Sequence, residues 1–442
     1  MGLQQARLLG LHLRRTGRGL AWLLTRGSGS GSNVGRPLPM NEPHHLSATT
    51  LHAHVTRRPE WRATCSAAML ILLHAWAAHA EGEVNLVRVP EGGIQPQIVS
   101  DENGTLHLLY FKGEASAGDL FYARQAPGDS GFGKPIRVNG RPGSAMAVGT
   151  IRGGQLAVGE HGRIHVAWNG PVPKGGDHTQ APMLYTRLND DGSAFEPERD
   201  VITKARGLDG GGSVAADGRG NVYVTWHAPK PGNTQGEAGR AVFVAHSRDG
   251  GRSFAPERLA IEQATGACGC CGMKAFADGR GNLFISYRGA SETGYRDQLL
   301  LVARDGRLDF QVALTQPWKV AACPMSSTSF SQTVDSVLAA WETADQVCWS
   351  RFRPGAQQPT PPSSPPTVGR NPKHPVAVGN SRGEVLLVWT EGTGWAKGGD
   401  VAWQRFDAAG KPVRGKEHVS GLPTWSMAAA VTTRDGRFVV VY

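Results

Sequence analysis

Short stretches of alternating apolar and polar residues recur along the chain, each ending in Trp or Tyr and all but one preceded by a Gly-containing turn. The closing aromatics are residues 110, 168, 226, 287, 341, 389 and 442, so there are seven copies at steps of 48 to 61 residues. Alternation with a period of two predicts strands rather than helices. The seven copies read DENGTLHLLY, EHGRIHVAW, DGRGNVYVTW, DGRGNLFISY, VDSVLAAW, SRGEVLLVW and RDGRFVVVY.

This repeat predicts an all-β fold, a β-propeller of four-stranded blades, because one such blade takes roughly 40–50 residues. The seventh copy stops at Tyr442, and Glu83–Val89 is a lone candidate strand before the first full unit. We therefore expect seven inner-hairpin repeats, forming six full units plus a composite closing blade. A six-bladed ring with a spare hairpin is the alternative, because the fifth unit has a poor last strand around the Pro-rich run 358–366.

Composition supports a turn-dense all-β domain, with 59 Gly, 12 Trp and only 19% charged residues. The formal net charge of +10 is unevenly spread, since residues 1–80 hold nine Arg and two Glu, which leaves +3 for residues 81–442. A body this close to neutral gives no reason to expect a nucleic-acid partner.

The N-terminal region predicts export. We expect residues 1–55 to be a disordered extension or a mis-assigned start, residues 56–80 a signal peptide, and residues 81–442 the propeller. Within 56–80, three arginines precede the apolar stretch Ala67–Ala78, which is too short to span a bilayer, and an A-x-A cleavage site follows at Ala78–Ala80. The expected protein is periplasmic or secreted, with no stable membrane span after cleavage.

One turn carries a recognisable motif. Residues 247–254 read SRDGGRSF and match the Asp-box, S-x-D-x-G-x-x-[W/F], through Ser247, Asp249, Gly251 and Phe254. The carboxylate accepts turn N–H groups, the glycine permits the bend and the aromatic packs into the blade. An Asp-box within a propeller resembles the sialidase (neuraminidase) superfamily, and this resemblance implies glycan binding, or the activity of an exo-sialidase or another glycoside hydrolase on an acidic sugar.

A second resemblance is narrower. The elements Cys268–Gly269–Cys270–Cys271, Tyr287–Arg288, Arg296–Asp297, Trp318 and Cys323–Pro324 are similar to a pattern of exported bacterial sialidase-like propellers. That pattern is C-x-C-C, then [W/Y]-R, then R-D, then W-x-x-x-x-C-P.

The cysteines occupy equivalent places in neighbouring units. Cys268, Cys270 and Cys271 precede the first strand of the fourth unit, and Cys323 precedes that of the fifth, so we expect all four near the channel mouth. Three interpretations stay open: a disulfide between Cys323 and one of the other three, a thiolate metal cluster with His227, or a reactive thiol. No other cofactor is expected.

The residues that follow the second strand of each unit should share this face, namely Lys112, Asn169, His227, Arg288, Glu342 and Glu391. They are either ordinary ion pairs of a solvated mouth or a site for an anion or sugar. Sialidase chemistry needs arginines for the substrate carboxylate, an acid, and a Tyr nucleophile backed by Glu. Arg288 and Arg296 are candidates for the first role, Asp297 and Glu342 for the second, and Arg88 for further binding, but no Tyr–Glu pair can be assigned. The alternatives are a non-catalytic propeller that binds a glycan or protein partner, a glycoside hydrolase, and a metal or redox site.

Overall fold

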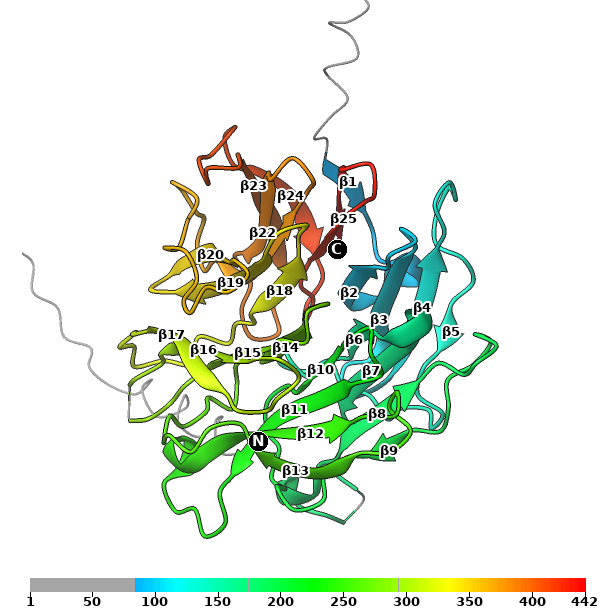
Figure 1. The fold of residues 1–442 in the computed structure, drawn as a ribbon, viewed down its shortest axis with the longest axis vertical. Helices are drawn as coiled ribbons and strands as arrows, with labels where there is room; N and C mark the ends of the chain where they lie inside the picture. The colour runs from blue at the N-terminus through cyan, green and yellow to red at the C-terminus, as the bar shows by residue number, and fades with distance from the viewer. Residues whose placement is uncertain (1–83, 174, 293) are drawn as a thin grey trace, which may run out of the picture. The chain divides into compact units, whose positions relative to one another are not determined.

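Seven small β-sheets surround a central channel in the computed structural model, which describes residues 84–173, 175–292 and 294–442 (Figure 1). The predicted seven-bladed propeller is confirmed, and the six-bladed alternative is wrong. The expected N-terminal extension and signal peptide lie outside the described residues.

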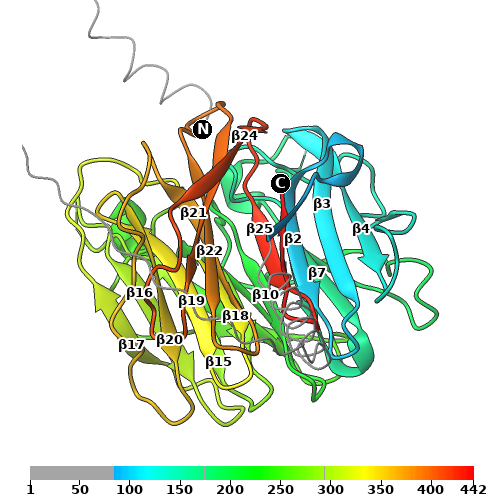
Figure 2. The same cartoon turned by 90° about the horizontal axis from the view of Figure 1, so that it is seen from above.

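The first strand of each blade lines the channel, and the following strands lie progressively further out. Figure 2 shows the strands running between the two faces of the ring. The helical segments in the described part of the chain are the short 3-10 turns η1 (Pro90–Gly92), η2 (Glu160–Gly162), η3 (His178–Gln180) and η4 (Gly236–Gly239). The strands of the first three blades are β2 (Ile94–Ser100), β3 (Leu106–Glu114), β4 (Ala117–Gln125), β5 (Ile136–Arg137); β6 (Gln155–Val158), β7 (Ile164–Asn169), β8 (Met183–Arg187), β9 (Arg199–Asp200); and β10 (Ser213–Ala216), β11 (Val222–Pro229), β12 (Arg240–Ser247), β13 (Ala255–Leu259).

The remaining blades follow in chain order, and the last one combines both ends of the described chain. Their strands are β14 (Lys274–Ala277), β15 (Leu283–Arg288), β16 (Gln298–Ala303), β17 (Gln311–Gln316); β18 (Ser329–Gln332), β19 (Val337–Thr343), β20 (Gln346–Phe352); β21 (Lys373–Gly379), β22 (Val385–Glu391), β23 (Gly399–Phe406), β24 (Glu417–Leu422); and β25 (Ala429–Thr432), β26 (Phe438–Val441), β1 (Val84–Val87).

The recurring aromatics form the contacts between blades. Trp168 packs with Leu109 and Phe111 of the preceding blade, and Trp226 packs likewise with Met183 and Tyr185. Four of the tryptophans, Trp168, Trp226, Trp341 and Trp389, are completely buried. An aromatic side chain recurs in each repeat because every blade must bury its face against the blade before it.

The ring closes as the sequence predicts, by adding the N-terminal strand to the last blade. β1 pairs with β26 in parallel register, Val84 opposite Phe438 and Val87 opposite Val441. Beyond the pair, Tyr442 N donates to Val87 O (3.0 Å), so the closure covers the exposed edge of the C-terminal hairpin. In Figure 1 the blue β1 lies beside the red end of the chain.

The fifth blade has three strands instead of four. Only a single bridge, Trp349 with Ser363, stands where the outer strand would be. Proline has no N–H group for a strand ladder, so the Pro-rich run 358–366 joins β20 only through isolated hydrogen bonds, such as those from Ser363 N to Trp349 O (2.9 Å) and from Thr360 N to Arg351 O (2.9 Å).

The Asp-box forms the turn between β12 and β13 and satisfies its own polar groups. Asp249 accepts hydrogen bonds from Ser247 Oγ (2.7 Å) and from Ser253 N (2.9 Å). Gly251 has a φ of +79°, and a Cβ there would overlap the Tyr185 hydroxyl. Phe254 packs edge-on against Tyr185, with ring centroids 4.8 Å apart. Burial alone would raise the pKa of Asp249, but the hydrogen bonds from Ser253 and Ser247 outweigh it and lower the pKa to about 2.

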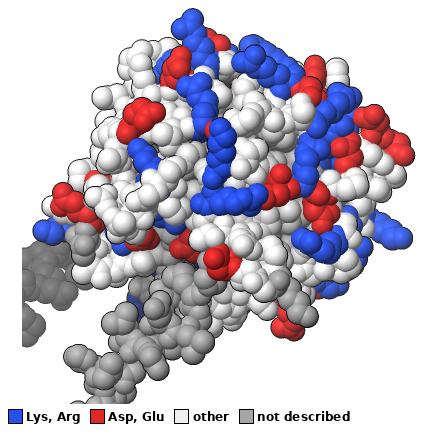
Figure 3. Space-filling model, turned by 90° about the horizontal axis from the view of Figure 1, so that it is seen from below, with Lys and Arg blue, Asp and Glu red and all other residues white. Residues whose placement is uncertain are grey.

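The surface carries both signs of charge. Figure 3 shows one side of the ring, where Lys and Arg side chains are interleaved with Asp and Glu. Within the described residues, none of the helices is long and apolar enough to cross a membrane.

Candidate functional site

The cysteine loop, residues 268–272, leads from the third blade into β14. Cys268 N donates to Arg288 O (2.9 Å), and Gly272 N donates to Ser326 O (2.9 Å) in the loop before β18. Gly269 N donates to Glu237 Oε1 (2.6 Å), from the loop between β11 and β12. The loop is therefore held by three consecutive blades.

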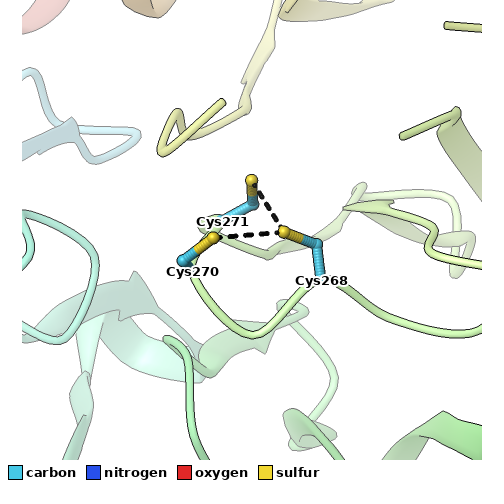
Figure 4. A group of neighbouring side chains, drawn as sticks. All are labelled: Cys268, Cys270 and Cys271. Atoms are coloured by element: carbon cyan, nitrogen blue, oxygen red, sulfur yellow. Dashed lines mark hydrogen bonds between the residues drawn. The ribbon is translucent and has the colours of Figure 1, made fainter. Parts of the chain in front are cut away.

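Three sulfur atoms of this loop point toward one another (Figure 4). Cys268 Sγ lies 3.4 Å from Cys270 Sγ and 3.3 Å from Cys271 Sγ, and the three sulfurs all lie within 4.8 Å of one another. Cys323 interacts with the thiols of Cys268 and Cys270. We call Cys268, Cys270, Cys271 and Cys323 the thiol cluster.

No disulfide joins the five cysteines of the described residues, all of which are free thiols. The structure thus brings the four expected cysteines together, while their pairing stays a prediction. The fifth, Cys348 of β20, is buried elsewhere and donates to Trp341 O (3.5 Å).

The thiol cluster shares its protons unequally. Hydrogen bonds from Cys268 and Cys270 lower the pKa of Cys271 well below its usual range, and hydrogen bonds from the same two thiols lower that of Cys323 to about 3. The pKa of Cys270 is raised because its thiol donates to its neighbours. Thiols whose pKa values are lowered by neighbouring thiols and arginines favour metal binding and nucleophilic reactions, because the thiolate is the reactive form.

Arg288 and Arg296 border the cluster but are occupied by the protein. Arg288 is buried, donates to Arg296 O (2.9 Å) and Glu342 O (2.5 Å), and lies over the Trp318 ring at 5.1 Å. Arg296 donates to Glu237 Oε2 (2.9 Å) and interacts with Cys268 and Cys323. The arginine pair expected for a substrate carboxylate therefore braces the thiol cluster instead.

His227 lies on the other side of the cysteine loop, buried and neutral. Its Nδ1 accepts a hydrogen bond from Arg240 Nε (2.9 Å), so Nε2 must carry the proton of the neutral ring. That Nε2–H has no hydrogen-bond partner in the described residues. Burial and the nearby Arg240 lower the pKa of His227 to about 3. His227 is thus a hydrogen-bond donor facing the cluster, and its expected role as a metal ligand does not fit this tautomer.

Glu342 is the buried acid of this face. Its Oε1 lies 3.7 Å from Lys373 Nζ, and its Oε2 has no hydrogen-bond partner in the described residues. Burial raises the pKa of Glu342 to about 6, although Lys373 and Arg288 act in the opposite direction. Since only 2% of the side chain is exposed, it is positioned beneath the surface and not toward a ligand in solvent.

The other expected site residues serve the framework. Asn169 braces the glycine loop before β10 by donating to Gly210 O (2.7 Å), and Asp297 accepts from Trp318 N (3.0 Å). Lys112 forms an ion pair with Glu91 at the surface (2.6 Å). Glu391 accepts hydrogen bonds from Trp389 Nε1 (2.7 Å) and from Lys416 Nζ. Arg88 donates to Gly421 O (2.8 Å) and lies over the ring of Tyr442. None of these five joins the thiol cluster.

The expected channel mouth is covered on this face by residues 147–153, from the connection between the first and second blades. Gln95 Nε2 donates to Ala147 O (2.6 Å) from the first blade, and Arg152 Nε donates to Asp209 O (3.0 Å) at the third. Ile151 forms part of the channel wall. Any ligand site on this face must therefore lie around residues 147–153 and not at an open channel mouth. The strand repeat did not predict this cover.

Behind this cover the channel forms a partly open cavity of about 270 Å³, whose lining includes an unexpected lysine. Lys274 Nζ donates to Gln97 Oε1 (3.0 Å) and Gln155 Oε1 (2.8 Å), and burial lowers its pKa to about 8. Sequence reasoning missed it because a lysine beginning a strand carries no sign that it points toward the axis.

Sequence reasoning also missed an aromatic groove on the rim. Trp395, between β22 and β23, is 57% exposed and stands edge-on to Trp425, with ring centroids 4.8 Å apart. The groove beside them is lined by Thr150, Met325, Lys373, His374, Thr393, Lys397 and Ser426. The only signal was a tryptophan outside the repeat, in the segment GTGW.

No family model matches this sequence. No curated protein matches it either.

Solved structures share the architecture. A protein of unknown function from Dyadobacter fermentans is 16% identical, with 65% of this chain and 88% of that chain covered and a TM-score of 0.43. A Hadza microbial sialidase is 11% identical, with 74% of each chain covered and a TM-score of 0.47. A GH93 α-L-arabinofuranosidase of Fusarium graminearum is 10% identical, with 77% and 97% covered and a TM-score of 0.46. By its own topology the described chain is a seven-bladed propeller with an Asp-box between β12 and β13.

Proposed function

We propose that this protein is a non-catalytic propeller that binds a glycan at the groove beside Trp395. The observation that carries the proposal is the exposure of that indole. Trp395 is the single aromatic among the exposed large apolar side chains of the described residues, the others being Val312, Val334 and Val413. An exposed indole leaves a large apolar surface in water, which a ligand with an apolar face can cover.

The surroundings of Trp395 suit a sugar. The groove is shallow, with a volume of about 20 Å³, and combines two indoles with hydroxyl groups and two lysines. A sugar would therefore rest on the exposed indole and reach these polar groups from the surface. Lys397 is exposed and free to meet a carboxylate, so the positive charge favours an acidic sugar.

A glycan array followed by calorimetry with the best-bound oligosaccharide tests the proposal. Trp395→Ala should weaken binding at least ~10-fold and lower the unfolding free energy by only about 1 kcal/mol, because the indole is more than half exposed and its main contact is with Trp425. Val334→Ala, at a side chain that is 81% exposed elsewhere, is the matched control and should leave binding unchanged. Failure to bind any glycan, or equal binding by Trp395→Ala, would contradict the proposal.

The alternative of a glycoside hydrolase rests on one observation, the raised pKa of Glu342, as a general acid requires. Against it, Arg288 and Arg296 bind protein groups, and the Tyr287 hydroxyl is buried against Thr265 Oγ1 (2.8 Å). Release of free sugar from the array ligands by the wild type, together with loss of this release in Glu342→Gln, would favour the glycoside hydrolase.

We also propose that the protein is exported with cleavage after Ala80, on the evidence of its N-terminal sequence. N-terminal sequencing of the periplasmic or secreted protein should then begin at Glu81. A cytoplasmic protein that retains Met1 would contradict this.

A further inference from the structure

The thiol cluster lies apart from the proposed glycan groove, and its chemistry differs. Three of its sulfurs come from residues 268–271 before β14 and lie within 4.8 Å of one another. The fourth, on the exposed Cys323 before β18, lies outside that group and interacts with Cys268 and Cys270 from the neighbouring blade. Cys268 and Cys271 have the C-x₂-C spacing that is common among zinc ligands, and a second loop supplies the fourth sulfur, as it does in structural zinc sites.

The distances between the sulfurs distinguish a metal site from a disulfide. A tetrahedral zinc ion with Zn–S bonds of 2.3 Å separates its sulfurs by about 3.8 Å, whereas a disulfide joins them at about 2.05 Å. Cys268 Sγ lies 3.4 Å from Cys270 Sγ and 3.3 Å from Cys271 Sγ. These separations are much closer to the spacing around a metal ion than to a bond. One sulfur also has two equivalent neighbours, which a disulfide cannot join at once.

The groups around the sulfurs suit a negatively charged metal centre. Four thiolates around Zn²⁺ carry a formal charge of −2. The positive charge of Arg296 attracts the sulfurs of Cys268 and Cys323, and that of Arg288 attracts the sulfur of Cys271. The Ser326 backbone N–H donates to Cys271 as well. Donors that hold and orient the ligands in this way are characteristic of built metal sites.

A buried donor without a partner also points to a charged ligand. His227 is 2% exposed, and its Nε2–H has no hydrogen-bond partner in the described residues. Gly210 and Gly269 show where it points, because a Cβ on Gly210 would lie 2.9 Å from His227 Nε2 and also touch the carbonyl of Gly269. A thiolate bound to a metal would give this N–H an acceptor.

We propose that Cys268, Cys270, Cys271 and Cys323 bind one Zn²⁺ ion with tetrahedral sulfur coordination. The ion ties the loop that opens the fourth blade to the loop that opens the fifth. Zinc fits because four sulfur ligands in tetrahedral geometry favour it among divalent metals, and because it needs no redox partner. This site goes beyond the proposed glycan binding and does not depend on it.

Titration of the full chain with Zn²⁺ alone tests the site, after purification under reducing conditions and removal of metal with a chelator. Calorimetry with a competing chelator should give one ion per chain. Cys268→Ser and Cys323→Ser should each weaken binding by more than ~100-fold. Cys348→Ala is the matched control, since this buried free thiol lies outside the cluster, and it should bind Zn²⁺ as the wild type does.

Two further readouts keep the test decisive if a variant folds poorly. Co²⁺ added in place of Zn²⁺ should give the thiolate-to-metal absorption band and strong visible bands of a tetrahedral sulfur site, which Cys323→Ser should lose. Zn²⁺ should also raise the melting temperature of the wild type and of Cys348→Ala but not of Cys268→Ser. Near-ultraviolet circular dichroism from the buried tryptophans reports whether each variant is folded.

Several outcomes would overturn the proposal. They are failure of the reduced wild type to bind Zn²⁺, binding by Cys268→Ser equal to that of the wild type, and a Co²⁺ spectrum without thiolate character. Tight binding of Cu⁺ by a protein that ignores Zn²⁺ would overturn the assignment to zinc. Peptide mapping that finds the cluster fully disulfide-bonded in the protein isolated from its native compartment would do the same.

Discussion

The Asp-box turn of the third blade and the thiol cluster at the start of the fourth are both short, glycine-containing loops with several polar side chains. In the turn, the carboxylate of Asp249 and the hydroxyls of Ser247 and Ser253 are all joined to one another or to backbone N–H groups. In the cluster, the sulfurs have mainly each other, and four buried atoms around them have no hydrogen-bond partner in the described residues: His227 Nε2, Arg288 Nε, Arg296 Nε and Glu342 Oε2.

This difference separates a structural motif from a binding site. A loop that satisfies its own polar groups needs nothing else and stabilises the fold. A cluster that leaves buried polar groups unpaired costs stability unless a ligand completes it. The predictions below test this contrast, from the largest expected effect to the smallest.

Acidification should destabilise the folded protein through one buried histidine beside the turn and two beside the cluster. Burial lowers the pKa to about 3 in His165 beside the turn and in His227 and His374 beside the cluster. The unfolded chain takes up these protons near pH 6.5 and the folded chain only near 3, so the free energy of unfolding falls as the pH drops between those values. Each histidine contributes about 1.4 kcal/mol per pH unit, so the three together give a slope of about 4 kcal/mol per pH unit. Urea unfolding at pH 7, 6 and 5 measures the slope.

Single variants divide this slope between the two regions. His165→Gln and His227→Gln should each reduce it by about one third. A slope unchanged by one of them would show that the corresponding ring titrates normally in the folded protein.

Gly251→Ala should damage the turn severely, by about 3 kcal/mol or more. A side chain there would have a φ of +79° and would overlap the buried Tyr185 hydroxyl. Thermal and urea unfolding give the loss. Gly218→Ala is the control, because a Cβ at that position meets nothing within 4 Å. Equal stability of the two variants would contradict the packing described for the turn.

Asp249→Ala should lower the free energy of unfolding by about 1–3 kcal/mol and leave the binding of Zn²⁺ and of glycan unchanged, because it removes an acceptor from turn N–H groups. Urea unfolding measures the loss of stability, and the calorimetric titrations measure the binding of Zn²⁺ and of glycan. Weaker binding at unchanged stability would instead give the turn a functional role.

Gly269→Ala should show the opposite pattern in the cysteine loop. A Cβ there would overlap Asp209 Oδ2, and the ion pair with Arg152 (3.1 Å) restrains that carboxylate, so the cysteine loop should shift at a stability cost of about 1 kcal/mol or less. Displacement of the loop should weaken Zn²⁺ binding by more than ~10-fold, as measured by chelator competition. Unchanged zinc affinity would mean that the loop tolerates the shift.

The strand repeat, the aromatic at the end of each copy and the Asp-box were sufficient to predict the seven blades and their closure. These features are local, and each copy faces the same packing requirement, so a period of two and a step of 48 to 61 residues carry the information. The same register placed Cys323 beside Cys268, because equivalent positions in consecutive blades are neighbours.

Only the tertiary structure decided how the side chains on this face are used. The Arg288 side chain donates to backbone carbonyl groups, and His227 accepts a hydrogen bond from Arg240. Residues 147–153 cover the channel, and Trp395 remains exposed. These outcomes depend on loops of differing length that meet from blades far apart in the chain. The repeat determines where such loops begin and end, but their contacts follow from packing and hydrogen bonding in three dimensions.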